Sequence, residues 1–293
     1  MNKFSIFTIV IFSLINPVFA KIIETDDSTV IRKELQNLTN EDLVTFDVKG
    51  VLFEPEDNIL KPGNIWFVKS FLSTIRQNNP READRLEGIV LLNYKPVLLD
   101  KKIPEIIKDT RKRGLKIIAL TSGMTGEIGS VTSRQDLRIS KLKSLDIDFT
   151  GSFKLTRLFL DRTDEGNIRI GRKDGFANDA IFKDGIIFTS RRPKAKILNI
   201  FLDKVEFQPK KIIHIDNSID KISDIQRMCE SKNIEFVGIH YVKQYTNSVN
   251  SSFDKKTAEK KIEILKTKSL WLSDKVAHCL AHTGFDINYC RSQ

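Results

Sequence analysis

The sequence predicts an α/β protein built on a doubly wound parallel sheet. Four short apolar runs have the length of buried strands, at residues 43–48, 116–123, 211–216 and 235–240. Helical patterns separate these runs, and strands that alternate with helices favour parallel pairing through right-handed crossovers. Three of the runs end in a polar residue: Asp47, Thr121 and Asp216. This is typical of a sheet that binds ligands at its carboxyl edge.

Length and composition indicate a soluble globular protein. The 293 residues can bury one large core, or one core plus a small accessory domain. The net charge of +10 suits an anionic partner. However, the lysines are spread over the whole chain, and no zinc finger or aromatic-basic motif accompanies them. We therefore interpret the lysines as general solvation and expect no specific nucleic-acid binding.

Residues 1–20 have the pattern of a signal peptide. Lys3 gives a positive start, residues 4–15 are mainly apolar, and Val18 and Ala20 are small residues at the two cleavage positions. The sequence thus predicts a mature chain that begins near Lys21 and is exported, to the periplasm or beyond the cell. No later stretch approaches about 20 apolar residues, so no transmembrane segment is expected after signal removal.

Export changes the interpretation of the three cysteines. An oxidising compartment permits a disulfide, and Cys279 with Cys290 is the most local pair. Three unpaired thiols, including Cys229, are the alternative.

The mature chain divides into a lead-in at 21–42, an α/β domain at 43–250, and a C-terminal helix and tail at 251–293. The lead-in is polar, with one short helix at about 30–36. Apolar residues at helical spacing over 62–79 predict a helix, and a second helical stretch follows at 80–99, so a helical insertion spans about 54–100. Basic residues and then Gly114 end a predicted helix at 103–113.

The second half of the chain continues the alternation of strands and helices. A helix is predicted over 137–145, and short alternating runs between turn residues indicate a small β-rich cap insertion at about 150–190. Helices at 193–204 and 219–232 flank the third strand. A lysine-rich amphipathic helix is predicted over 255–281. Insertions of this kind normally cover a site and select its substrate.

The polar residues at the strand ends form an ordered set. Asp47 opens Asp-Val-Lys-Gly-Val-Leu, Thr121 and Ser122 end the second strand, and Lys194 begins a predicted helix. The last strand continues as Ile213-His-Ile-Asp216-Asn-Ser-Ile-Asp220. This order resembles the haloacid dehalogenase (HAD) superfamily, which is dominated by magnesium-dependent phosphatases. The resemblance spans about residues 43–242 and is closest to an uncharacterised exported bacterial branch.

The resemblance implies a phosphohydrolase or phosphotransferase that acts on a small phosphorylated or other anionic substrate. Asp47 would be the nucleophile and a metal ligand, because a carboxylate can form an aspartyl-phosphate. Thr121, Ser122 and Lys194 would bind the phosphoryl oxygens as charge develops. Asp216, Asp220 and the main-chain carbonyl of Lys49 would complete a Mg²⁺ site of oxygen ligands.

Two positions depart from this pattern. Lys49 stands where phosphatases of the superfamily have the Asp that protonates the leaving group, and Asn217 stands where a second Asp is common. Lys49 could act as an acid only if burial lowered its pKa. The alternative function is therefore a catalytically degenerate binding or effector protein that keeps the fold.

Each assigned residue also has a purely structural interpretation. Thr121 and Ser122 could cap the following helix, and Asp216 could form a turn. Lys194 could be a surface lysine, in which case Lys196 is the alternative phosphate ligand.

The histidines are weaker candidates. His278 and His282 lie four residues apart on a predicted helix, a spacing that can bind metal, but the sequence offers no clear third ligand. His214 is expected to be a packed core residue.

Overall fold

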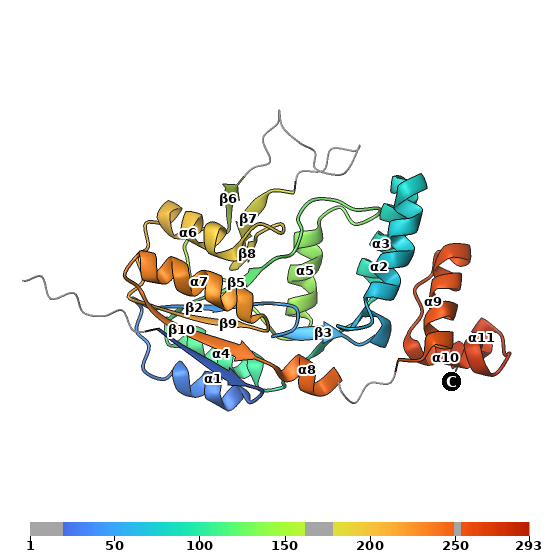
Figure 1. The fold of residues 1–293 in the computed structure, drawn as a ribbon, viewed down its shortest axis with the longest axis horizontal. Helices are drawn as coiled ribbons and strands as arrows, with labels where there is room; N and C mark the ends of the chain where they lie inside the picture. The colour runs from blue at the N-terminus through green and yellow to red at the C-terminus, as the bar shows by residue number, and fades with distance from the viewer. Residues whose placement is uncertain (1–19, 162–177, 249–252, 293) are drawn as a thin grey trace, which may run out of the picture.

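The computed structural model describes residues 20–161, 178–248 and 253–292. Its centre is an eight-stranded sheet in which six neighbouring strands are parallel and the last two, β7 and β6, are antiparallel (Figure 1). In spatial order the strands are β1 (Ala20–Thr25), β10 (Glu235–Tyr241), β9 (Lys211–Asp216), β2 (Leu43–Phe46), β5 (Lys116–Thr121), β8 (Ile186–Phe188), β7 (Ala180–Lys183) and β6 (Arg157–Asp161).

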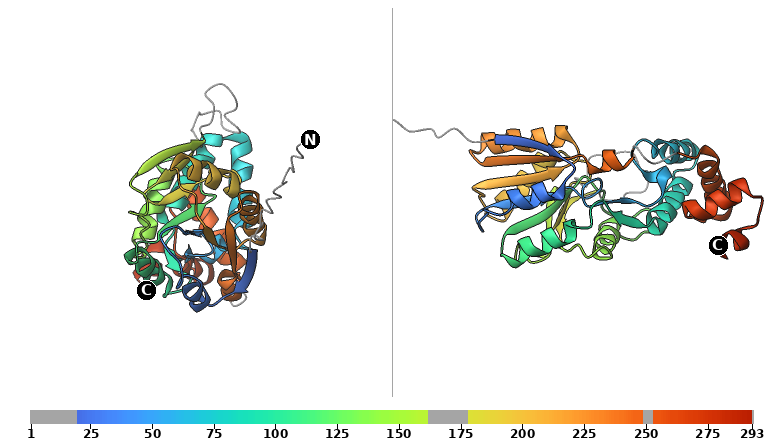
Figure 2. Two further views of the ribbon diagram at one scale, coloured as in Figure 1. Left: turned by 90° about the vertical axis from the view of Figure 1, so that its left-hand side faces the viewer. Right: turned by 90° about the horizontal axis from the view of Figure 1, so that it is seen from below.

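Helices cover both faces of this sheet (Figure 2). Alternate residues of β2 show the division, because Val44 and Phe46 belong to one hydrophobic core and Leu43 belongs to the other. The first core lies under α1 (Ser28–Glu34), α4 (Ile103–Lys112) and α5 (Arg134–Lys143), and the second under α6 (Lys194–Lys204) and α7 (Ile219–Ser231). The α/β class with a mostly parallel central sheet is confirmed.

A helical segment follows β2, as the sequence predicts. It contains α2 (Trp66–Asn78) and α3 (Pro80–Asn93), preceded by the short 3₁₀ helix η1 (Asn58–Leu60). The side chain of Asn79 accepts a hydrogen bond from the backbone N–H of Glu82, and Pro80 occupies the first turn of α3, so the second helix begins at once. The antiparallel strands β3 (Phe53–Pro55) and β4 (Pro96–Leu98) join the base of the segment.

The expected β-rich cap is not separate from the central sheet. The described strands of this region, β6, β7 and β8, extend the sheet beyond β5. The physical reason is apolar burial: Phe182 and Ile187 are almost fully buried in the core that lies under α6. Residues 162–177, which belong to the same predicted insertion, lie outside the described residues.

The predicted lead-in also belongs to the sheet. Its residues 20–25 form β1, which pairs in parallel with β10, and its short helix is α1, whose N-cap is Asp27. As an edge strand with one open face, β1 leaves Ile22 and Glu24 exposed while Ile23 packs on the core, so only part of the strand is apolar.

The long C-terminal helix of the prediction is broken. After α8 (Lys243–Ser248), the chain forms α9 (Lys255–Lys268), α10 (Asp274–His282) and α11 (Ile287–Ser292). The break is at Ser269, whose φ of 54° ends α9 in the left-handed conformation. Figure 1 shows α9, α10 and α11 beside the helical insertion, at the end of the molecule away from β1.

The C-terminal helices are held by a covalent bond and a buried ion pair. A disulfide joins Cys279 to Cys290, with 5.7 Å between their Cα atoms. The Nζ atom of Lys261 lies 2.5 Å from Oδ1 of Asp57 and 2.7 Å from Oδ1 of Asp274. Among the described residues, no helix combines the length and apolar character that crossing a membrane requires.

Candidate functional site

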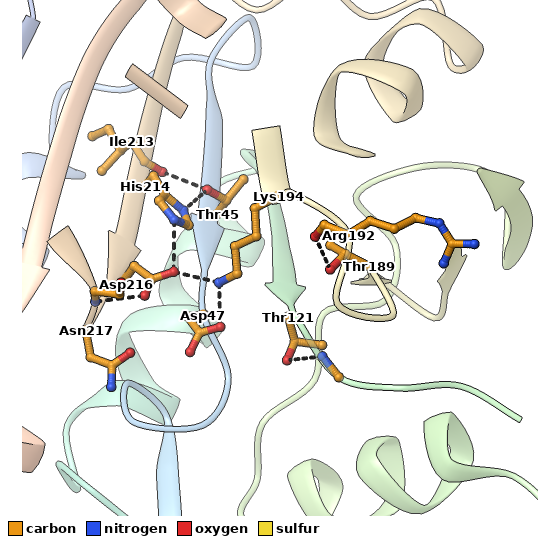
Figure 3. A network of polar contacts seen from close by, with 12 residues as sticks. Thr45, Asp47, Thr121, Thr189, Arg192, Lys194, Ile213, His214, Asp216 and Asn217 are labelled. Carbon is orange, nitrogen blue, oxygen red and sulfur yellow. Dashed lines mark hydrogen bonds and ion pairs between the residues drawn. The ribbon is translucent and has the colours of Figure 1, made fainter. Parts of the chain in front are cut away.

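Asp47, Lys194 and Asp216 meet at the carboxyl edge of the sheet (Figure 3). The Nζ atom of Lys194 lies 2.5 Å from Oδ1 of Asp47 and 2.6 Å from Oδ2 of Asp216. All three residues are buried, and Lys194 retains only 3% of its surface. The structure therefore brings together three of the predicted site residues from three separate segments.

The position of Asp47 follows from the chain topology. Asp47 comes directly after β2, between β9 and β5, and its backbone N–H donates a hydrogen bond to the carbonyl of Ile215. The crossovers that leave β2 and enter β9 run to opposite sides, so this is the point where an open α/β sheet forms a ligand crevice. Gly50 turns the chain away with a φ of 96°, and a Cβ at this position would lie 2.3 Å from the side-chain nitrogen of Asn217.

The ammonium of Lys194 interacts favourably with each of the two carboxylates. Burial alone would lower the pKa of the Lys194 ammonium, but the carboxylates of Asp47 and Asp216 outweigh burial and raise it. Burial would likewise raise the pKa of Asp216, yet Lys194 and the hydrogen bond from His214 bring it well below its ordinary value. Lys194 is therefore a permanent cation and Asp216 a permanent carboxylate at neutral pH.

Two neutral side chains position Asp216. Nε2 of His214 lies 3.2 Å from Oδ2 of Asp216, and Nδ1 lies 2.7 Å from the hydroxyl of Thr45. Burial keeps the pKa of His214 below its ordinary value, so the ring is neutral. Because the carboxylate can only accept, Nε2 carries the proton and Nδ1 accepts from Thr45. His214 is thus a core residue, as expected, but it also orients an acid of the site.

Thr121 and Ser122 stand at the carboxyl end of the strand that pairs with β2. Thr121 is buried at the end of β5, and its hydroxyl accepts a hydrogen bond from the backbone N–H of Gly123 at 3.2 Å. The next helix, α5, begins only at Arg134, so these hydroxyls do not cap it. The carbonyl of Ser122 accepts a hydrogen bond from the backbone N–H of Arg191, which ties this loop to the one before Lys194.

The loop before Lys194 is held in an unusual conformation. Ser190 and Arg191 have φ values of 49° and 66°, which non-glycine residues seldom adopt. The backbone N–H of Ser190 donates to the carbonyl of Gly123, and the buried side chain of Thr189 donates to the carbonyl of Arg192. Strain of this kind persists only where surrounding contacts fix it, and it clusters at functional sites.

Lys49 points away from the three buried charges. Its Nζ atom lies 3.5 Å from the carbonyl of Leu60, and its side chain lines a pocket beside the helical insertion. Burial, followed by the positive charges of Arg138 and Lys69, lowers the pKa of Lys49 to about 8. The structure thus shows a partly buried Lys49 with a lowered pKa, which the sequence alone could not reveal.

The oxygen donors fit a Mg²⁺ ion in part. Asp47 and Asp216 offer carboxylates at one edge, and Oδ2 of Asp47 has no hydrogen-bond partner among the described residues. Asp220 does not join them, because it is exposed in the first turn of α7. The predicted metal set is thus reduced to Asp47, Asp216 and the carbonyl of Lys49.

Lys196 and the C-terminal histidines have other partners. Lys196 is exposed and pairs with Asp161, so Lys194 and not Lys196 enters the site. Oδ2 of Asp254 lies 3.1 Å from Nδ1 of His278 and 2.8 Å from Nε2 of His282. Asp254 is therefore a third group beside the two histidines, which the sequence did not reveal. Asp254 also caps α9, and the two histidines lie on the surface, so ion pairing and helix capping account for these contacts.

Comparison with known proteins gives a family without a described activity. A model of a family described as proteins of unknown function (DUF2608) matches residues 24–278. Uncharacterised proteins of Rickettsia felis and Rickettsia conorii are each 28% identical, over 82% of this chain and 83% of theirs. A further one from Rickettsia bellii is 23% identical over 72% of both chains. No solved structure matches the chain significantly.

Proposed function

The chain belongs to the DUF2608 family. We propose, from the geometry of its buried charges, that it is a HAD-like, Mg²⁺-dependent phosphohydrolase or phosphotransferase that uses Asp47 as nucleophile. One observation carries the proposal: the ammonium of Lys194 lies between Asp47 and Asp216 at the carboxyl edge of a parallel sheet. An ordered Asp, Thr, Lys and Asp at that edge has the donors and charges that phosphoryl transfer requires.

In this mechanism, a carboxylate oxygen of Asp47 attacks phosphorus, and the bond from phosphorus to the leaving oxygen breaks. The leaving oxygen takes the electron pair of that bond. Lys194 and the hydroxyl of Thr121 hold the phosphoryl oxygens as negative charge develops. Water then attacks the aspartyl-phosphate, which releases phosphate and a proton and restores the Asp47 carboxylate. A phosphotransferase would use an acceptor alcohol in place of water.

Asp47, Asp216 and the main-chain carbonyl of Lys49 would hold the Mg²⁺ ion. When bound, the ion neutralises charge on the phosphoryl group. His214 keeps Asp216 oriented for this role through the hydrogen bond at Nε2, and Thr45 fixes the tautomer of the ring.

Lys49 determines which substrates suit the site. It replaces the Asp that would protonate a leaving group. Its pKa of about 8 leaves it mainly a cation at neutral pH, which would stabilise negative charge on the leaving oxygen. Substrates whose leaving oxygen is stable as an anion, such as aryl, enol or acyl phosphates, therefore fit best. Simple alkyl phosphates, whose leaving oxygen needs a proton as it departs, should react far more slowly.

A binding protein without turnover is the second candidate, and one contact favours it. The ammonium of Lys194 pairs with both carboxylates, which is the place that a metal cation would take in the enzyme. A chain that relies on this ammonium alone needs no metal and would bind an anion without cleaving it.

The test is hydrolysis of an aryl phosphate by the purified protein with and without Mg²⁺. Activity that is lost when a chelator removes Mg²⁺, and is also lost in Asp47→Asn, supports the enzyme. The chelator removes the metal that the proposed reaction needs, and the substitution removes its nucleophile. A folded protein that is inactive with aryl, enol and acyl phosphates alike rejects the enzyme in favour of the binding protein. Lys49→Asp supplies a further comparison, because it should extend activity to alkyl phosphates.

We also propose that the protein is exported after cleavage following Ala20. The disulfide between Cys279 and Cys290 supports this, because disulfides persist in oxidising compartments. N-terminal sequencing of the protein from its native cells should begin at Lys21, and an intact Met1 start would reject export by this route.

A further inference from the structure

A pocket of about 570 Å³ opens beside Lys49, between the helical insertion and α5. One wall is apolar and comes from α2 and α3, where Val68, Leu72 and Val90 line it. Lys49 is only two residues beyond Asp47, and Arg191 is three residues before Lys194. Two of the lining residues are therefore close neighbours of Asp47 and Lys194 in the sequence, although Asp47 and Lys194 do not line the pocket themselves.

The pocket carries an excess of positive charge. Five cations line it: Lys49, Lys69, Arg76, Arg138 and Arg191. Arg76 is neutralised, because its guanidinium lies 2.6 Å from Glu87 and 3.1 Å from Asp84. Among the described residues, the other four have no carboxylate within ion-pair distance.

These unpaired cations also act on one another. The positive charges of Arg138 and Lys69 both reach the half-buried Lys49, and each acts on it more strongly than the opposing charge of Glu54. Repulsion of this kind costs stability unless an anion enters the pocket and offsets it. Arg138 has an aromatic contact, since its guanidinium lies 5.4 Å from the centre of the Phe53 ring, but it pairs with no acid in the part of the chain that the structure describes. Arg191 is presented from the left-handed turn that contacts with the Ser122 loop maintain.

We propose that this pocket binds the leaving group of the substrate, and that this group is an apolar, ring-sized body bearing a second anionic group. The apolar wall of α2 and α3 would cover the body, and Lys69, Arg138 and Arg191 would bind the second anion. This inference rests on the proposed function, since it takes the phosphoryl group to be at Asp47. The proposal also explains why a lysine can stand at position 49. Its ammonium would not help a neutral alcohol to leave, but it stabilises an anionic leaving group.

Binding of the free leaving group tests the pocket without any turnover. A hydroxynaphthoate has the ring, the hydroxyl and a carboxylate, and the matching naphthol lacks only the carboxylate. Isothermal titration of the purified protein should give at least about tenfold tighter binding for the hydroxynaphthoate, because a charge-assisted contact is worth that much. Equal affinities for the two compounds, or binding of neither, would overturn the proposal.

Paired variants locate the binding. Arg138→Gln and Lys69→Gln should each weaken hydroxynaphthoate binding about tenfold and leave naphthol binding nearly unchanged. Lys143→Gln is the matched control, because Lys143 is exposed on the same helix as Arg138 and lies outside this pocket. A loss in the control equal to that in Arg138→Gln would show non-specific attraction to a basic protein and would also overturn the proposal.

The two proposals fail in distinguishable ways. Asp47→Asn abolishes turnover under the proposed function, but Asp47 does not line the pocket, so this variant should bind hydroxynaphthoate like the wild type. Selective binding in a protein that hydrolyses no phosphate would leave the pocket as an anion site and reject the enzyme. Phosphate hydrolysis without selective binding would keep the enzyme and reject the pocket.

Discussion

The Nζ atom of Lys194 lies 2.5 Å from Oδ1 of Asp47, although 147 positions separate the two residues in the sequence. Lys194 begins α6 and Asp47 follows β2, so the contact ties the second half of the chain to the first. The same ammonium reaches Asp216 at the end of β9. The charge of one lysine thus partly compensates two buried carboxylates. Replacing Lys194 should therefore lower stability as well as activity.

Lys194→Met should lower the free energy of unfolding by about 3–5 kcal/mol, because it leaves two buried carboxylates without their positively charged partner. Chemical denaturation followed by circular dichroism measures this loss. Lys196→Met is the control, since Lys196 is exposed and its ion pair should contribute less than about 1 kcal/mol. Equal stability of the two variants would show that the buried triad contributes no more than a surface pair.

Lys141 should make stability depend on pH above neutrality. Its Nζ atom donates to the carbonyl of Tyr94 at 2.6 Å, and burial, followed by the charge of Arg138, lowers its pKa to about 8. In the unfolded chain the pKa is near 10.5, so the unfolded state binds more protons between these values and stability rises with pH. Below pH 8 the cost of burying the charge is fully present.

The measurement compares wild type with Lys141→Met by denaturant unfolding from pH 7 to 10. The wild type should gain roughly 1–2 kcal/mol relative to the variant over this range, after allowance for solvent screening. Tyrosines and other lysines titrate in both proteins, so their effects cancel in the difference. A difference that stays constant with pH would contradict the lowered pKa of Lys141.

Lys261 should anchor the C-terminal helices to the helical insertion. Its ammonium bridges Asp57 and Asp274, and the indole N–H of Trp271 donates to the second oxygen of Asp57. Lys261→Met should therefore cost about 3–5 kcal/mol by leaving Asp57 buried and unpaired. Lys266→Met, at an exposed position of the same helix, should change stability by less than about 0.5 kcal/mol. Similar unfolding midpoints for both variants would rule out this anchor.

The strand ends of the site could be predicted because each apolar run stops at a polar residue. Asp47, Thr121 and Asp216 are recognisable on that ground alone, and the structure places all three at one edge. The choice between Lys194 and Lys196 could not be made from spacing, because both lie near the start of α6. Burial decided it: Lys194 is enclosed, whereas Lys196 faces solvent.

Other features depend on which strands are neighbours. His214 acquires its role because the β2–β9 register places Thr45 opposite it, and a single strand does not reveal that pairing. The resemblance to the HAD superfamily implied a place for Asp220 in the metal site, but the first turn of α7 carries it into solvent. The edge strand β1 was missed because its partner β10 comes more than 200 residues later.

The pairing of β1 with β10 has a consequence for the order in which the chain can fold. Lys21 pairs with Val237 and Thr25 with Tyr241, so the sheet cannot be completed until almost the whole chain is available. Contacts this distant in sequence form slowly, because a long loop must close before they stabilise anything. A chain truncated before β10 would leave the edge of β9 open to pairing with other molecules, and should aggregate rather than remain a smaller folded domain.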